Sequence, residues 1–138
     1  MPRLAAIWAG ECDISLGNTY YMGAMLKDDE QKEWAESVRI VFPTFEDGGT
    51  HVNVSGVAMT KSAPNRDAAL QLMQFLAGEE AQRIYAETNN EFPVTEGVER
   101  SELVASWGDF TADDLTLTEI SDLRPQALDL IERVNFDG

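Results

Sequence analysis

The strongest constraint on the fold is a run of apolar side chains at helical spacing within residues 63–88. Ala69, Leu72 and Leu76 recur every three or four positions, and the same pattern resumes after Gly78. Such spacing places apolar side chains on one face of an amphipathic helix. A glycine commonly ends a helix. The sequence therefore predicts two consecutive amphipathic helices, separated at Gly78.

Shorter segments on either side alternate between strand and helix character. Apolar and polar residues alternate, as in half-buried strands, in residues 12–18, 37–44 and 51–60. Further helices are predicted at residues 2–10, 19–36 and 121–138. Short strands that alternate with helices favour an α/β layered domain. We expect a small mixed sheet flanked by helices.

The charge balance limits the partners of this chain. Its 138 residues include 25 acidic and 10 basic side chains, which gives a formal net charge of -15. A surface of this charge repels nucleic-acid phosphates and anionic lipids and favours cations. No apolar run is as long as a membrane span, and the chain opens without a signal peptide. We therefore expect neither nucleic acid binding nor stable membrane insertion.

The first residues indicate that the chain begins inside a structural element. Residues 2–10 are already helical in pattern, with Leu4, Ile7 and Trp8 on one face and Gly10 as a terminator. No Ser, Thr, Asp or Asn precedes them as a helix cap. Our interpretation is that the chain is the tail portion of something longer.

Two candidate sites have simpler explanations. Four acidic residues could suggest calcium, but their spacing does not match an EF-hand loop and fits an exposed acidic loop; these are Asp109, Asp113, Asp114 and Glu119. Cys12 and His51 could form a nucleophile and base, but no third group orients them. A lone cysteine in an alternating segment is more often a small buried residue.

Two adjacent tyrosines, Tyr20 and Tyr21, follow Gly17-Asn18 at the expected start of a helix. On pattern alone, one ring would pack in the core and the other would lie at the surface. The alternative is that both phenols bind one ion. Phenolate oxygen is hard and anionic and suits ferric iron, and a bound metal can displace the proton of its ligand. The helix N-terminus there also offers free N–H groups to an anion.

The segment GECDISLGNTYYMG, residues 10–23, resembles the iron-ligating segment of the periplasmic ferric-iron-binding proteins, the solute receptors of iron(III) ABC transporters. The likeness continues through residues 49–94, which end in the turn NNEFPV, and into the final helix. The resemblance implies a partial type II periplasmic-binding-protein fold, whose two α/β lobes close over iron. It also implies a periplasmic location, a transporter permease as partner and no enzymatic activity.

The resemblance assigns roles to three residues. The adjacent tyrosines of the family supply two iron ligands and correspond to Tyr20 and Tyr21. The asparagine that helps to hold a synergistic anion, carbonate or phosphate, corresponds to Asn18. Because family members are much longer, the chain would be the C-terminal portion of a receptor, with the remaining ligands and the signal peptide upstream of Met1.

On the same resemblance, the chain would contribute to both lobes. Residues 1–55 would form a second-lobe segment with the tyrosine pair, 56–105 the return strand and helices of the first lobe, and 106–138 the closing segment and C-terminal helix. Exposed half-lobe surfaces could pair with a second copy. Two alternatives stay open: a receptor of the same fold for an oxyanion, thiamine or a polyamine, and a stand-alone interaction domain that binds no solute.

Overall fold

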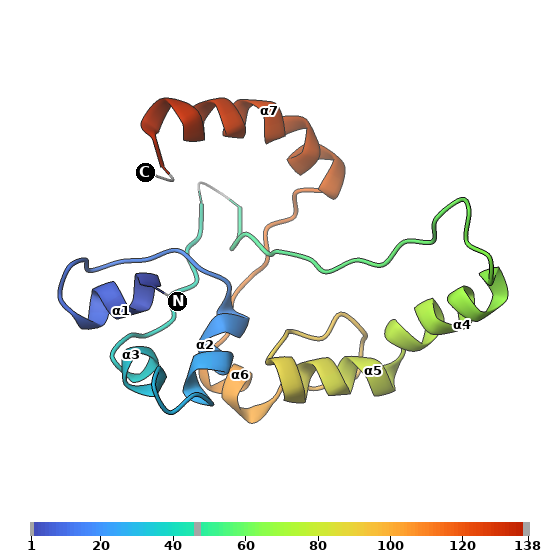
Figure 1. Cartoon of the computed structure of the whole chain (residues 1–138), viewed down its shortest axis with the longest axis horizontal. Helices are drawn as coiled ribbons and strands as arrows, with labels where there is room; N and C mark the ends of the chain where they lie inside the picture. Colours follow the sequence, from blue (N-terminus) through green and yellow to red (C-terminus); the bar gives the residue numbers. More distant parts are fainter. Residues whose placement is uncertain (1, 46–47, 137–138) are drawn as a thin grey trace. The chain divides into compact units, whose positions relative to one another are not determined.

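The computed structural model describes residues 2–45 and 48–136, and the described elements are helical (Figure 1). In chain order they are α1 (Pro2–Trp8), α2 (Thr19–Leu26), α3 (Lys32–Glu36), α4 (Arg66–Leu76), α5 (Glu79–Ile84), the π-helical turn η1 (Tyr85–Asn89), α6 (Glu102–Ser106) and α7 (Leu117–Val134). The helices predicted on either side of Gly78 are confirmed as α4 and α5. Two adjacent glycines, Gly48 and Gly49, also predict a turn within residues 46–52, and part of it, 46–47, lies outside the described residues.

The expected small mixed sheet does not form within the described residues. The three predicted strand segments are extended but unpaired, and the pairing described is a single parallel bridge between Thr50 and Ala112. A strand needs a neighbour for its backbone hydrogen bonds and a face to bury. Apolar side chains of these segments instead face solvent, with Ile14 83% and Val41 67% exposed. Alternation alone therefore predicted strands that lack partners here.

The described residues divide into two compact units, one within 1–42 and 53–109 and the other within 43–52 and 110–138. In the first unit, α2 packs on α3 and η1, α1 packs on α3, and α4 packs on α5. The buried apolar side chains of the described residues all belong to this unit: Met25, Ala35, Ala81, Ala86 and Val104. This small core holds α2 against the turn that follows α5.

A buried glutamine fixes the junction between α4 and α5. Gln82 is 8% exposed; its Nε2 donates to the Leu76 carbonyl at 3.0 Å and its Oε1 accepts from the Val94 N–H at 2.9 Å. The Thr95 hydroxyl donates to the Ala77 carbonyl at 2.9 Å. These bonds satisfy backbone groups that the helix break would leave open. They also hold the segment after η1 against the two helices.

The second unit consists of a short paired region and α7. Thr50 N–H donates to the Thr111 carbonyl at 2.8 Å, and Asp113 N–H donates to the Thr50 carbonyl at 2.9 Å. A capping box of Thr116 and Glu119 starts α7. This explains why the helix begins at Leu117, earlier than predicted. No described side chain of α7 is buried.

Candidate functional site: a tyrosine pair at the start of a helix

The amide of Asn18 is directed toward a tyrosine rather than toward its own helix. Asn18 precedes α2 in extended backbone conformation, and its carbonyl accepts from the Tyr21 N–H at 3.2 Å. Its side chain forms no capping hydrogen bond; instead, Nδ2 donates to the Tyr20 hydroxyl oxygen at 3.0 Å. Its Oδ1 accepts from Nδ2 of Asn53 at 3.3 Å. The helix start and the tyrosine pair are therefore linked by side-chain amides.

The two tyrosine rings lie together at the first turn of α2. Their centroids are 4.5 Å apart and their planes are inclined at 51°. Tyr20 and Tyr21 are each 36% exposed. The packing interpretation, with one ring in the core and the other at the surface, is therefore wrong. The structure brings together the three residues singled out in the sequence, Asn18, Tyr20 and Tyr21.

The surroundings of Tyr20 favour its neutral form in the absence of a cation. The pKa of the Tyr20 phenol is raised above its ordinary value, first by a hydrogen bond with the Tyr21 side chain, then by desolvation and by the charge of Tyr21. Asn18 lowers this pKa by donating to the phenol oxygen, and the Glu91 carboxylate raises it. Two neighbouring oxygens that would both become anionic repel one another, and a bound cation would offset that repulsion.

Close packing between α2 and η1 positions the site. Gly23 is buried, and a Cβ at this position would collide with the side chain of Asn90. Asn90 is 3% exposed and left-handed, with φ 57°. At the end of α2, Lys27 Nζ donates to the Thr88 carbonyl at 2.9 Å. These contacts explain how the NNEFPV turn brings Glu91 within electrostatic range of Tyr20.

The donor set suits a hard cation accompanied by an anion. Two phenol oxygens can each supply one negative charge, and phenolate is a hard oxygen ligand. The N–H groups at the start of an eight-residue helix attract an anion. Asn18 has a second Nδ2–H beyond the one that it donates to Tyr20. The arrangement can therefore hold an oxygen-coordinated cation with an anion beside it.

Sequence reasoning missed Asn53 and Glu91 as neighbours of the pair. Asn53 lies in an extended segment and reaches Asn18 from 35 positions away. Glu91 follows η1, and its carboxylate accepts from Asn89 Nδ2 at 3.0 Å. Both residues lie inside the segments that carry the resemblance. No local pattern pointed to either, because their proximity depends on long-range folding.

The other sequence candidates do not form a site. Cys12 is exposed, so the prediction that it is a buried apolar residue is wrong. Among the described residues, no group of three or more His, Cys, Asp or Glu side chains could hold a metal ion. Three of the acidic residues have other partners: Asp109 binds Arg100 at 2.6 Å, Asp113 Oδ1 accepts from the Leu115 N–H at 2.9 Å, and Glu119 caps α7.

The Thr116 hydroxyl and N–H both donate to the Glu119 carboxylate, and these hydrogen bonds keep the pKa of that carboxyl below its usual value. A capping box produces this shift because its hydrogen bonds favour the ionised carboxylate. Glu119 therefore has a structural role at the start of α7.

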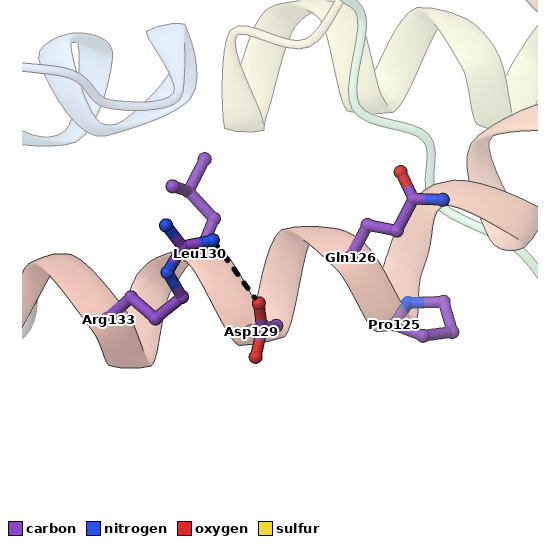
Figure 2. Close-up of a pocket in the computed structure, with 5 residues that line it drawn as sticks. All are labelled: Pro125, Gln126, Asp129, Leu130 and Arg133. Atoms are coloured by element: carbon purple, nitrogen blue, oxygen red, sulfur yellow. Dashed lines mark ion pairs between the residues drawn. The ribbon is translucent and has the colours of Figure 1, made fainter.

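A shallow depression on α7 is lined by residues of that helix alone: Pro125, Gln126, Asp129, Leu130 and Arg133 (Figure 2). Its charged members pair with one another, Arg133 to Asp129 at 3.7 Å. It offers no convergent polar groups from a second element, as a solute site would.

In the part of the chain that the structure describes, no helix is both long enough and apolar enough to cross a membrane.

Comparison with known proteins defines the class. Residues 7–112 match the family described as bacterial extracellular solute-binding protein, and the chain belongs to this family. The family consists of solute-binding proteins rather than enzymes, as expected from the sequence.

Among particular relatives, the chain is 45% identical to iron uptake protein A1 of Synechocystis sp. over 120 residues, 86% of this chain and 33% of the relative. It is 29% identical to the major ferric iron-binding protein of Neisseria meningitidis serogroup B over 133 residues, 96% of this chain and 39% of the relative. The chain therefore spans well under half the length of these relatives.

Solved structures agree on the fold. The apo ferric ion-binding protein A of Pasteurella haemolytica superposes with a TM-score of 0.92 at 46% identity, over 99% of this chain and 43% of that one. The Trichodesmium FutA protein, solved with iron and citrate ligands, gives a TM-score of 0.87 at 35% identity, over 96% and 43% of the two chains. The predicted α/β class of type II periplasmic binding proteins is confirmed, although the described residues form no sheet of their own.

Proposed function

We propose that this chain carries the tyrosine half of the iron site of a ferric-iron-binding receptor. Tyr20 and Tyr21 would bind Fe(III) as phenolates, and Asn18 would orient a synergistic anion, carbonate or phosphate. The observation that carries the proposal is the pairing of the two phenols at the start of α2, with an asparagine N–H on one of them. The names of the relatives, which bind ferric iron or take up iron, support the choice of cation.

The chain would act as the C-terminal portion of a two-lobe receptor. The superposition includes 99% of this chain but only 43% of the Pasteurella haemolytica protein. Large apolar side chains on α4 and α7 are exposed, among them Leu72 at 56% and Leu130 at 54%. Exposed apolar surface on this scale is typical of a face that another part of a protein covers. The intact receptor would deliver iron in the periplasm to the permease of an iron(III) ABC transporter.

The test is a titration of the chain with a soluble ferric chelate in bicarbonate buffer, followed by visible absorption. Phenolate-to-iron charge transfer should give a band in the wild type that weakens in Tyr20→Phe and in Tyr21→Phe and disappears in the double variant. Tyr85→Phe is the matched control, because Tyr85 is the third tyrosine of the chain and lies in η1. A wild type without the band, or a double variant that keeps it, would sink the assignment.

Competition separates ferric iron from the other solutes. Sulfate, thiamine or a polyamine should leave the ferric band unchanged, whereas phosphate should change its position if it replaces carbonate beside the metal. If one of these molecules binds in the absence of iron and the tyrosine variants lose that binding, the chain belongs to a receptor of the same fold for that solute. Binding of neither iron nor solute would favour a stand-alone interaction domain.

A further inference from the structure

We propose that Asn53 is a positioning residue for the tyrosine site. It would hold the Asn18 carboxamide in the orientation that presents an N–H group, rather than the C=O group, to the Tyr20 oxygen. The inference rests on the proposed ferric function for its consequence, but the orientation itself is a property of the metal-free chain. It assigns a role to a residue that sequence patterns did not single out.

A carboxamide has a donor end and an acceptor end, so a bond that fixes one end also fixes the other. Nδ2 of Asn53 donates to Oδ1 of Asn18 at 3.3 Å, and Nδ2 of Asn18 donates to the Tyr20 oxygen at 3.0 Å. In the proposed ferric complex the Tyr20 oxygen would be a phenolate, which can only accept. If the Asn18 amide turned around, a carbonyl oxygen would face the phenolate and repel it.

The constraint has to come from outside the helix. Asn18 is the N-cap residue of α2, and asparagine is favoured there because its side chain usually accepts from the helix N–H groups. Here it makes no such bond. Asn53 comes from the extended segment that follows the second unit's residues 43–52, far from α2 in sequence. Its N–H competes for the Asn18 oxygen that would otherwise cap the helix, and so leaves the donor end on Tyr20.

The orientation can be measured in the metal-free chain by NMR. In the wild type, the side-chain NH₂ protons of Asn18 should give nuclear Overhauser effects to the ring protons of Tyr20. Asn53→Asp is nearly isosteric but can only accept, so the Asn18 amide should turn to donate to it and these effects should disappear. Asn53→Leu removes the donor without adding charge and should weaken them. Unchanged effects in both variants would overturn the proposal.

A second measurement connects the orientation to iron. The ferric affinity of Asn53→Asp, read from the phenolate band, should fall by about tenfold or more, the size expected when a donor to a charged oxygen is replaced by an acceptor. Ser55→Asp is the charge-matched control, since Ser55 is exposed on the same extended segment. An equal loss in both Asp variants would refute a role through Asn18.

The two measurements fail separately. A wild type with no band overturns the ferric assignment, while the NMR result still decides whether Asn53 orients Asn18. If the wild type shows the band and both Asn53→Asp and Asn53→Leu bind Fe(III) with wild-type affinity, the role of Asn53 is overturned and the ferric assignment stays intact.

Discussion

At the scale of single residues, the tyrosine pair places the phenol of Tyr20, whose pKa is raised, beside a second phenol. Tyrosine phenols keep their protons at neutral pH, and the pKa of Tyr20 is raised further by its hydrogen bond with Tyr21. In the metal-free chain, Tyr20 is therefore neutral at neutral pH. A ferric ion would have to displace the protons of both phenols. The site should therefore select a small, highly charged cation over a cation of lower charge, which displaces these protons less readily.

Proton release follows from this chemistry and can be counted. Binding of Fe(III) by both phenols should release roughly two protons per iron, because metal ligands bind in their deprotonated form. Affinity should then fall as pH falls, by roughly a hundredfold per unit between pH 8 and pH 6. A pH-stat titration in weak buffer measures the release, and Tyr20→Phe should release one proton fewer. The same release from the double phenylalanine variant would contradict phenolate binding.

At the scale of elements, the contact between α2 and η1 determines whether the site assembles. This contact leaves no room for a side chain at position 23, because Asn90 occupies the space. The same interface includes the bond from Lys27 to the Thr88 carbonyl. A change that separates α2 from η1 would therefore move Glu91 and the tyrosine pair apart.

Gly23→Ala tests this interface. Overpacking a buried contact costs about 1–3 kcal/mol, and the gain of about 1 kcal/mol from alanine's helix propensity offsets only part of it. We expect a net loss of stability, measured as a lower urea midpoint at unchanged slope. Gly56→Ala is the control, since a Cβ at Gly56 meets no atom within 4 Å. Equal stability of the Gly23 variant and the wild type would show that the α2–η1 contact is not close-packed.

Local patterns predicted the helices better than the strands. Helical periodicity and Gly78 determined α4 and α5 because these signals act within a few residues. No pattern in the sequence predicted α6, although Ser101 caps it and Gly108, with φ 94°, lies just beyond its end. The strand predictions were wrong for the opposite reason, because a strand forms only beside a distant segment that pairs with it, and alternation within one segment does not reveal such a partner.

The residues of the candidate site also differ in whether the sequence could locate them. The resemblance located Asn18, Tyr20 and Tyr21, and the structure brings them together. Asn53 and Glu91 reach the site through tertiary contacts, which single-sequence patterns do not encode.

At the scale of the whole molecule, the small core contrasts with the amount of exposed apolar surface. The buried apolar side chains among the described residues include only two larger than alanine, Met25 and Val104. Neither α4 nor α7 has a buried residue among those described. A domain of this length normally buries well over half of the surface of its unfolded chain. We therefore expect low stability in isolation and a gain from a complementary polypeptide.

Complementation measures that gain. The part of the Pasteurella haemolytica protein that this chain does not match, supplied as a separate polypeptide, should raise the melting temperature of the chain and strengthen ferric binding. It should also reduce the fluorescence of a dye that binds exposed apolar surface. Leu72→Glu on the exposed face of α4 should weaken the effect, whereas Gln71→Glu, exposed on the same helix, should not. An unchanged melting temperature would contradict the expectation that the exposed apolar surface of the chain is covered by that polypeptide.

The diverted side chain of Asn18 also has a consequence for motion. A helix that lacks its side-chain cap gives up about 1 kcal/mol of local stability, so the first turn of α2 should open more readily and exchange its amide hydrogens sooner than later turns. An anion seated on those amides would replace the missing cap. Ligand binding would then stabilise the turn that carries both tyrosines. Slower amide exchange in the first turn of α2 would therefore indicate that iron and its anion are bound.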